Sequence, residues 1–113
     1  MDKLKTYRKI LIKVLERHAA IKIDNMPLVA SKLIIDKTQT NFLVFDIGWH
    51  KKSFVHNIVF HFEIKKGKIY AYKNATDFDI IGELIEAGIP ENEFIIPEID
   101  LSEPKNTALE EAA

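Results

Sequence analysis

The chain has no cysteine among its 113 residues, and this absence removes several kinds of chemistry at once. Disulfide bonds, thiolate-bound zinc and cysteine nucleophiles are all excluded. Long apolar runs are missing as well, since no stretch approaches the roughly 20 residues of a membrane-spanning helix. The opening residues MDKLKTYRK also lack the apolar segment of a secretion signal. We therefore expect a cytoplasmic protein, and at this length a single domain.

A net excess of charge is lacking too, because the formal net charge is only −1. The charges are nevertheless uneven: residues 1–22 hold seven Lys and Arg against two acids, and residues 91–113 hold seven acids against one lysine. A basic end can contact nucleic acid, but a solvated helix face explains the same pattern. Because a dedicated DNA-binding domain is usually basic overall, direct DNA contact ranks below other modes of action and stays open.

The hydrophobic pattern predicts an α+β fold with an N-terminal long helix at about residues 2–20, for which Asp2 is the N-cap. A four-stranded antiparallel β-meander follows, because the links between its strands are too short for parallel crossovers. A second capped helix, a short extended C-terminal arm at residues 94–97 and an acidic tail complete the chain. We expect residues 1–97 to form the domain and residues 98–113 to be a flexible acidic tail. The predicted strands are residues 29–36, 42–49, 54–64 and 69–73.

The third predicted strand alternates strictly between two faces. Val55 and Val59 lie on one face and are expected to point away from the core. The apolar set expected on the core face is Phe54, His56, Ile58, Phe60, Phe62 and Ile64.

The second helix has clear start and stop signals in the sequence. Thr76 is predicted to be its N-cap, with Asp79 three residues later. Gly88, Ile89 and Pro90 predict a Schellman motif followed by a hard stop. The expected buried residues of this helix are Phe78, Ile81, Leu84 and Ile85.

Residues with catalytic or metal-binding chemistry form no complete site in the sequence. His56 and His61 are five apart in one strand and therefore point to opposite faces. The four glycines are dispersed, so there is no glycine-rich phosphate loop. The one enzymatic alternative is Asp46 followed by Glu63 and Lys65, which resembles the core of a metal-dependent nuclease. We expect no catalytic residue, cofactor or metal, with this nuclease pattern as the alternative.

Several short motifs together resemble the XisI family, the fdxN element excision controlling factor proteins of cyanobacteria. They are the opening MDKLKTYRKILIKVL, Gly48-Trp49, the stretch HFEIKKGKIYAYKNATD at residues 61–77, Glu83-Leu84, and Gly88-Ile89-Pro90. The resemblance covers roughly residues 1–96. Asp77 stands where the family usually has Glu, and after Ile96 the acidic tail replaces the usual segment with His, Pro-Pro, Arg and Tyr-Thr.

The resemblance implies a regulatory accessory protein without catalytic residues of its own. Members of the family are associated with excision of a DNA element, alongside a site-specific recombinase and a nuclease-like companion, XisH. It follows that an XisH-like protein is the expected partner. Direct DNA binding by the basic first helix is the further alternative.

Aromatic residues on the predicted sheet are the candidate partner interface. Trp49, Tyr70 and Tyr72 are expected on a surface rimmed by lysines, because aromatic residues often dominate contact energy. Val55 and Val59 complete this candidate interface. We also expect a homo-oligomer, since a chain this short has no second helical layer to cover the other face of the sheet. If they gathered at one end of the sheet, five lysines could make phosphate contacts beside the aromatic residues, but hairpin tips are often lysine-rich only for solubility and edge protection. These lysines are Lys51, Lys52, Lys65, Lys66 and Lys68.

Overall fold

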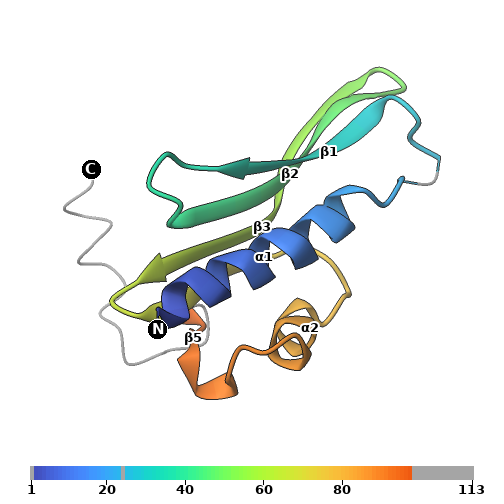
Figure 1. Ribbon diagram of the computed structural model, residues 1–113. Coiled ribbons are helices and arrows are strands. Elements are labelled where there is room, and N and C mark those ends of the chain that lie inside the picture. Colours follow the sequence, from blue (N-terminus) through green and yellow to red (C-terminus); the bar gives the residue numbers. More distant parts are fainter. Residues whose placement is uncertain (1, 24, 98–113) are drawn as a thin grey trace.

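The structure, a computed structural model, describes residues 2–23 and 25–97 (Figure 1). It confirms the α+β class, with the long N-terminal helix and the second helix in place. The expectations for residues 98–113 lie outside the described residues. None of the helices in the described ranges has the length and apolar character to cross a membrane. In chain order the elements are α1 (Lys3–Ala19), β1 (Val29–Ile35), β2 (Asn41–His50), β3 (Ser53–Lys65), β4 (Lys68–Asn74), α2 (Ile80–Glu86), the 3-10 helix η1 (Glu91–Glu93) and β5 (Phe94–Ile95).

The sheet has five strands in the order β1-β2-β3-β4-β5, and the first four form the predicted antiparallel meander. The expected C-terminal arm adds the fifth strand, with Ile69 opposite Phe94 and Tyr70 opposite Ile95. This last pairing is parallel, because α2 and η1 provide the long crossover that parallel neighbours need. The sheet is therefore mixed.

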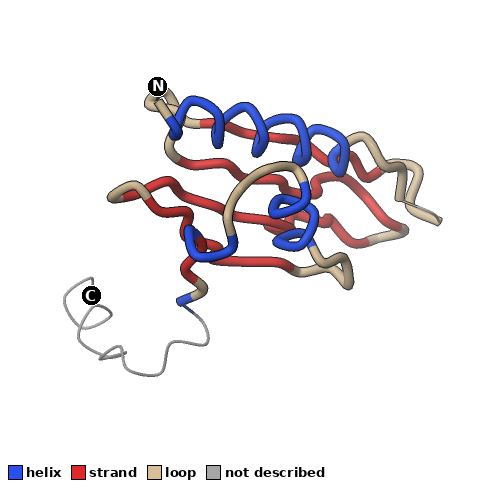
Figure 2. The backbone as a smooth tube through the Cα atoms, turned by 60° about the horizontal axis from the view of Figure 1, so that its bottom comes forward, coloured by secondary structure: helices blue, strands red, loops and turns tan. Residues whose placement is uncertain are grey.

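The hydrophobic core lies between one face of the sheet and the two helices, which cover the same side (Figures 1 and 2). The helix α1 forms because its apolar residues recur at three- and four-residue steps, and the carboxylate of Asp2 caps it by accepting from the Leu4 N–H at 3.0 Å. Leu11 and Leu15 of α1 and Leu84 of α2 are fully buried. Each such side chain contributes about 1.5–3 kcal/mol by leaving water. Their partners on the sheet include Phe42, Val44, Phe60, Phe62, Ile64 and Ile69.

The alternation predicted for the third strand is interrupted by a β-bulge. Val44 pairs with Phe60 but Phe45 pairs with Ile58, so Val59 is an extra residue in β3. Because Val44 and Phe45 point to opposite faces of β2, Phe60 and Ile58 point to opposite faces of the sheet. The prediction of one continuous core face was therefore wrong. Phe60, Phe62 and Ile64 are buried, whereas Phe54, His56 and Ile58 are exposed.

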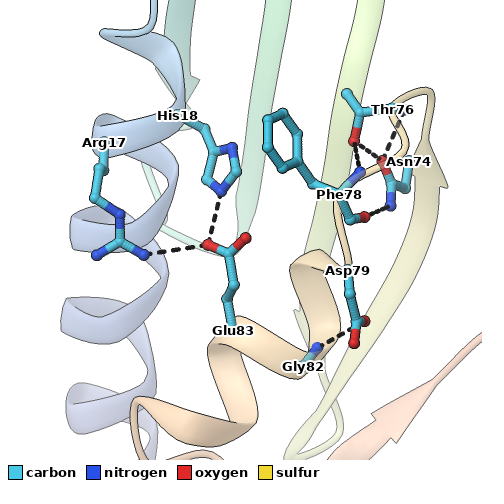
Figure 3. A network of polar contacts seen from close by, with 8 residues as sticks. All are labelled: Arg17, His18, Asn74, Thr76, Phe78, Asp79, Gly82 and Glu83. Carbon is cyan, nitrogen blue, oxygen red and sulfur yellow. Dashed lines mark hydrogen bonds and ion pairs between the residues drawn. The ribbon is translucent and has the colours of Figure 1, made fainter.

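The second helix starts later than the sequence indicated. Its N-cap is Asp79, whose carboxylate accepts from the Gly82 N–H at 3.0 Å (Figure 3). Thr76 instead builds the preceding turn, because its hydroxyl donates to Asn74 and accepts from the Phe78 N–H. The predicted N-cap was wrong for this reason. The buried residues of α2 are Ile80 and Leu84, and Phe78 is 49% exposed.

The predicted C-terminal stop of α2 is confirmed. Gly88 has a positive φ of 126° and its N–H donates to the Ile85 carbonyl, while the Ile89 N–H donates to the Leu84 carbonyl at 3.1 Å. These two bonds define a Schellman motif. The buried side chain of Ile89 then anchors the chain to the core before Pro90.

A buried carboxylate ties the end of the described chain to its beginning. Glu93 is 6% exposed and accepts hydrogen bonds from Lys3 Nζ at 2.8 Å, Lys68 Nζ at 3.0 Å and the Tyr7 hydroxyl at 3.1 Å. The hydrogen bonds from Lys3 and Lys68 lower the pKa of Glu93 to about 2. This cluster holds η1, and hence β5, against α1 and β4.

Candidate interaction surface

The face of the sheet opposite the helices is the outstanding surface of the molecule, and we call it the outer face. No helix covers it within residues 2–23 and 25–97 (Figures 1 and 2). The strand registers place on it large apolar and aromatic residues from all four long strands. These residues include Ile34, Phe45, Trp49, Phe54, His56, Ile58, Tyr70 and Tyr72.

One cluster of the outer face surrounds the hairpin between β2 and β3. Trp49 and Phe54 are opposite each other in the register, with ring centroids 5.3 Å apart in an edge-on arrangement. The His56 ring lies between Phe54, at 6.2 Å, and Phe45, at 5.7 Å. Trp49 is 54% exposed and Phe54 is 53% exposed, and Ile58 extends the apolar surface along β3. Exposed aromatic groups of this kind are typical of contact surfaces.

A second cluster lies at the β3–β4 side of the outer face and combines aromatic rings with polar groups. Tyr72 is an extra residue in β4, because His61 pairs with Lys73 and Phe62 pairs with Ala71. Its ring contacts both His61, at 4.9 Å, and Tyr70, at 6.0 Å. Its hydroxyl donates to Glu63 at 2.6 Å, and partial burial together with this bond raises the pKa of Tyr72 to about 12.

The surroundings of His61 and Lys65 complete the second cluster. His61 Nε2 lies 3.0 Å from the side-chain oxygen of Asn41, and burial lowers the pKa of the imidazole. Lys65 Nζ lies 4.7 Å from the centre of the Tyr70 ring, a cation–π contact. His61, Tyr72 and Lys65 thus each contact a neighbouring side chain of the cluster, which favours a preorganised surface.

The predicted interface residues fall into three places. Tyr70 and Tyr72 lie together in the second cluster, and Trp49 lies in the first. The placement of Val55 and Val59 away from the core was wrong, because the bulge exchanges the faces of β3. Val59 packs against the core and lines a small cavity with Phe60, and Val55 is half-buried opposite Gly48.

The hairpin lysines do not gather at one end of the sheet. Lys51 and Lys52 form the turn between β2 and β3, whereas Lys66 and Gly67 form the turn between β3 and β4. Consecutive turns of a meander lie at opposite ends, and the 13 residues of β3 separate these two. At 3.3 Å per residue this separation is about 40 Å. The five lysines therefore do not form one cluster: Lys51 and Lys52 lie near Trp49, whereas Lys65 lies over Tyr70 at the other end. The two aromatic clusters lie far apart along β3.

The nuclease pattern is not assembled in the fold. Asp46 lies on the helix side of β2 and accepts from the Ser31 hydroxyl at 2.6 Å, next to core residues Val44 and Phe60. Glu63 lies on the outer face, where it accepts from Tyr72. A sheet separates the two carboxylates, so they cannot hold one metal ion. Within the described part of the chain, no three His, Cys, Asp or Glu side chains are grouped as metal ligands.

With this geometry established, comparison with known proteins gives the family. The family model described as XisI protein matches residues 1–109. The chain belongs to the XisI family. The match continues past residue 96, where the motif resemblance ended, into the acidic tail. No curated protein matches the chain.

Two crystal structures from Anabaena variabilis share the XisI fold of this chain. An XisI-like protein has 28% identity and a TM-score of 0.74, with 81% of this chain and 84% of that protein covered. The fdxN element excision controlling factor XisI has 27% identity and a TM-score of 0.69, with 94% of this chain and 99% of that protein covered.

The polar network between the two helices of this XisI-family chain has a structural role (Figure 3). Glu83 accepts from His18 Nε2 at 2.8 Å and from Arg17 at 3.1 Å, and these bonds lower the pKa of its carboxyl. The His18 ring packs edge-on against Phe60 at 5.4 Å and Phe78 at 4.9 Å. Every partner is within the chain, so the network fixes α2 on α1.

The basic residues of α1 that favoured DNA contact border an open groove against α2. Lys9, Lys13 and Arg17 line this groove, which has a volume of about 500 Å³, and Glu83 and Glu86 line its other wall. The acids offset much of the positive charge, and Arg17 is bound to Glu83. The site that sequence reasoning missed is instead the Phe45, Phe54 and Ile58 part of the outer face, because period-two alternation assigned Phe54 and Ile58 to the core.

Proposed function

We propose that this chain is an accessory factor in DNA element excision that acts by protein contact, without catalysis of its own. Its XisI-family membership and its likeness to an excision controlling factor support the regulatory role. The observation that carries the mode of action is the outer face, where Trp49 and Phe54 are each more than half exposed. Hydrophobic residues at this level of exposure, gathered on one face, favour a docking surface.

The partner we propose is an XisH-like protein, which would supply any cleavage chemistry alongside a site-specific recombinase. Aromatic residues are the usual hot spots of such contacts. The first aromatic cluster, Trp49, Phe54 and His56, is the anchor, and the tyrosine cluster of Tyr70 and Tyr72 is the rigid flank. Burying the polar groups around Tyr72 on docking costs little free energy, because the Tyr72 hydroxyl and the Glu63 carboxylate are already hydrogen-bonded to each other.

The test is a titration of this chain with the XisH-like protein of the same genome, measured by calorimetry. Phe54→Glu buries a charge in the proposed contact and is expected to weaken binding at least about tenfold. Phe78→Glu is the matched control, because Phe78 is 49% exposed but lies at the helix side. It should change the affinity by less than about threefold. Absence of association at micromolar concentration, or equal losses in both variants, would overturn the proposal.

The absence of catalysis has its own assay. Plasmid and single-stranded DNA are incubated with the chain and magnesium or manganese, and no cleavage is expected. The separation of Asp46 and Glu63 by the sheet supports this expectation. Metal-dependent cleavage that disappears in both Asp46→Ala and Glu63→Ala would establish the nuclease instead.

A further inference from the structure

The first strand leaves one edge of the sheet open to a further strand. Within the described residues, β1 pairs only with β2. The Asp36 N–H donates to Asn41 and the Leu28 carbonyl accepts from Trp49, so even-numbered residues direct their backbone groups toward β2. The register has no shift along β1. Ser31, Leu33 and Ile35 therefore direct their N–H and C=O groups toward the free edge.

In the helix layer, one flank of α1 lies next to this edge of the sheet. Ala19 lines a hollow with Ala30 and Ser31, and Arg8 Nε donates to the Gln39 carbonyl at 3.0 Å beyond the end of β1. At 100° per residue, Ile12 lies on the same flank of α1, between Arg8 and Ala19. Ile12 is only partly buried against the core. An unpaired strand edge and an incompletely buried helix flank thus lie one above the other.

We infer that a second copy of this chain pairs with β1 as an antiparallel neighbour about a two-fold axis at Leu33. This register opposes Leu33 to itself and Ser31 to Ile35 of the second copy, which satisfies the outward backbone groups of all three residues. It also places Lys32 opposite Ile34. A two-fold axis at Lys32 would instead set two lysines directly against each other, which is unfavourable. The edge carries no proline and no other charge within Val29–Ile35 to prevent pairing.

The second layer fits the same two-fold axis. Neighbouring strands are about 4.8 Å apart, so helices packed over β1 and β2 of each copy come within about 10 Å of each other. This spacing suits helix packing through Ile12 and Ala19 of both copies. Both α1 and β1 are about 25 Å long, and two layers are about 20 Å deep. The contact covers about 500 Å² per copy, or about 1,000 Å² in total, which is the lower limit for a specific interface.

The experiment measures the mass of the chain alone by sedimentation equilibrium at several concentrations. The wild-type chain is expected to form dimers at micromolar concentration. Ile34→Lys places two lysines opposite each other at each of the two symmetric positions and should weaken the dimer about tenfold. Ile34→Glu places opposite charges there and should dimerise more tightly than Ile34→Lys, with the difference reduced at high salt.

Two further variants separate this interface from the outer face. The double variant Lys32→Glu with Ile34→Lys restores opposite charges and should recover dimerisation relative to Ile34→Lys alone. Phe54→Lys adds an equal charge at a residue of the outer face on β3 and should leave the dimer unchanged. A monomeric mass at about 100 µM would overturn the inference. Equal weakening by Ile34→Lys and Phe54→Lys, or equal weakening by Ile34→Lys and Ile34→Glu, would overturn it as well. The experiment contains no XisH-like protein, so its outcome does not depend on the proposed function.

Discussion

Replacing Gly48 by alanine tests the close approach between the first two strands. Gly48 has a φ of 148° and lies opposite Val29 in the register. A Cβ atom at this position would overlap the carbonyl oxygen of Leu28 and lie 2.8 Å from the Cα of Val29. Both obstacles are backbone atoms, so no side-chain rotation relieves them. The start of β1 must then move away from β2.

The expected cost follows from two contributions. Forcing a residue with a Cβ into this glycine-only region costs about 1–3 kcal/mol, and overpacking costs about 1–3 kcal/mol. The lower entropy of the unfolded alanine chain offsets about 0.4–1 kcal/mol. We expect Gly48→Ala to lose about 3 kcal/mol, a large part of the 5–15 kcal/mol of a typical domain.

The matched control is Gly67→Ala in the hairpin between β3 and β4. Gly67 also has a positive φ, 76°, but a Cβ there would have no neighbour within 4 Å. This variant should lose only about 1 kcal/mol, the cost of the left-handed conformation alone. Urea unfolding followed by circular dichroism measures both. With a slope of about 2 kcal/mol per molar, the midpoints should fall by about 1.5 M for Gly48→Ala and about 0.5 M for Gly67→Ala. Equal shifts would refute the steric argument.

Two smaller predictions concern the buried carboxylate and the helix cap. Because the pKa of Glu93 is lowered from 4.5 to about 2, its contribution to stability is complete above pH 4.5 and is lost as the pH falls toward 2. Glu93→Gln should therefore be less stable than the wild type at pH 7, with the gap in urea midpoint closing toward pH 2; a gap independent of pH would contradict the assignment. Asp79→Ala removes the observed N-cap of α2 and should lose about 1 kcal/mol of unfolding free energy. Thr76→Ala, which changes only the preceding turn, should lose less, and the reverse order would restore Thr76 as the cap.

Much of the fold follows from local sequence signals. The α1 helix begins at the residue after Asp2 because an apolar stripe and a capping side chain coincide there. The Gly88-Ile89-Pro90 stop is read directly, since glycine tolerates the positive φ that the motif requires. The cap of α2 was not predictable in the same way, because Thr76 and Asp79 both have capping side chains and the turn built by Asn74 decides between them.

The candidate surface was predictable only in part, for a physical reason. Trp49, Tyr70 and Tyr72 were expected on a sheet surface, and they lie on the outer face. Val55 and Val59 were misplaced because pairing with β2, which is a long-range interaction, creates the bulge at Val59. The pairing of Phe94 with Ile69 likewise depends on the packing of η1 and not on the local sequence.

The bulge at Val59 also divides the longest strand into two segments that should accept different substitutions. Even-numbered residues after residue 59 pack in the core, whereas even-numbered residues before it lie on the outer face, away from the helices. Along β3, the positions that tolerate substitution should therefore be even-numbered before residue 59 and odd-numbered after it. Straightening the strand without loss of a residue would turn Phe54 and Ile58 toward the helices, because Val59 would then pair with Phe45. Deleting Val59 would instead remove the bulge and keep Phe54 and Ile58 on the outer face, because Ile58 would then follow Phe60 in regular alternation. Among related chains, a one-residue gap at this point would therefore leave the outer surface intact.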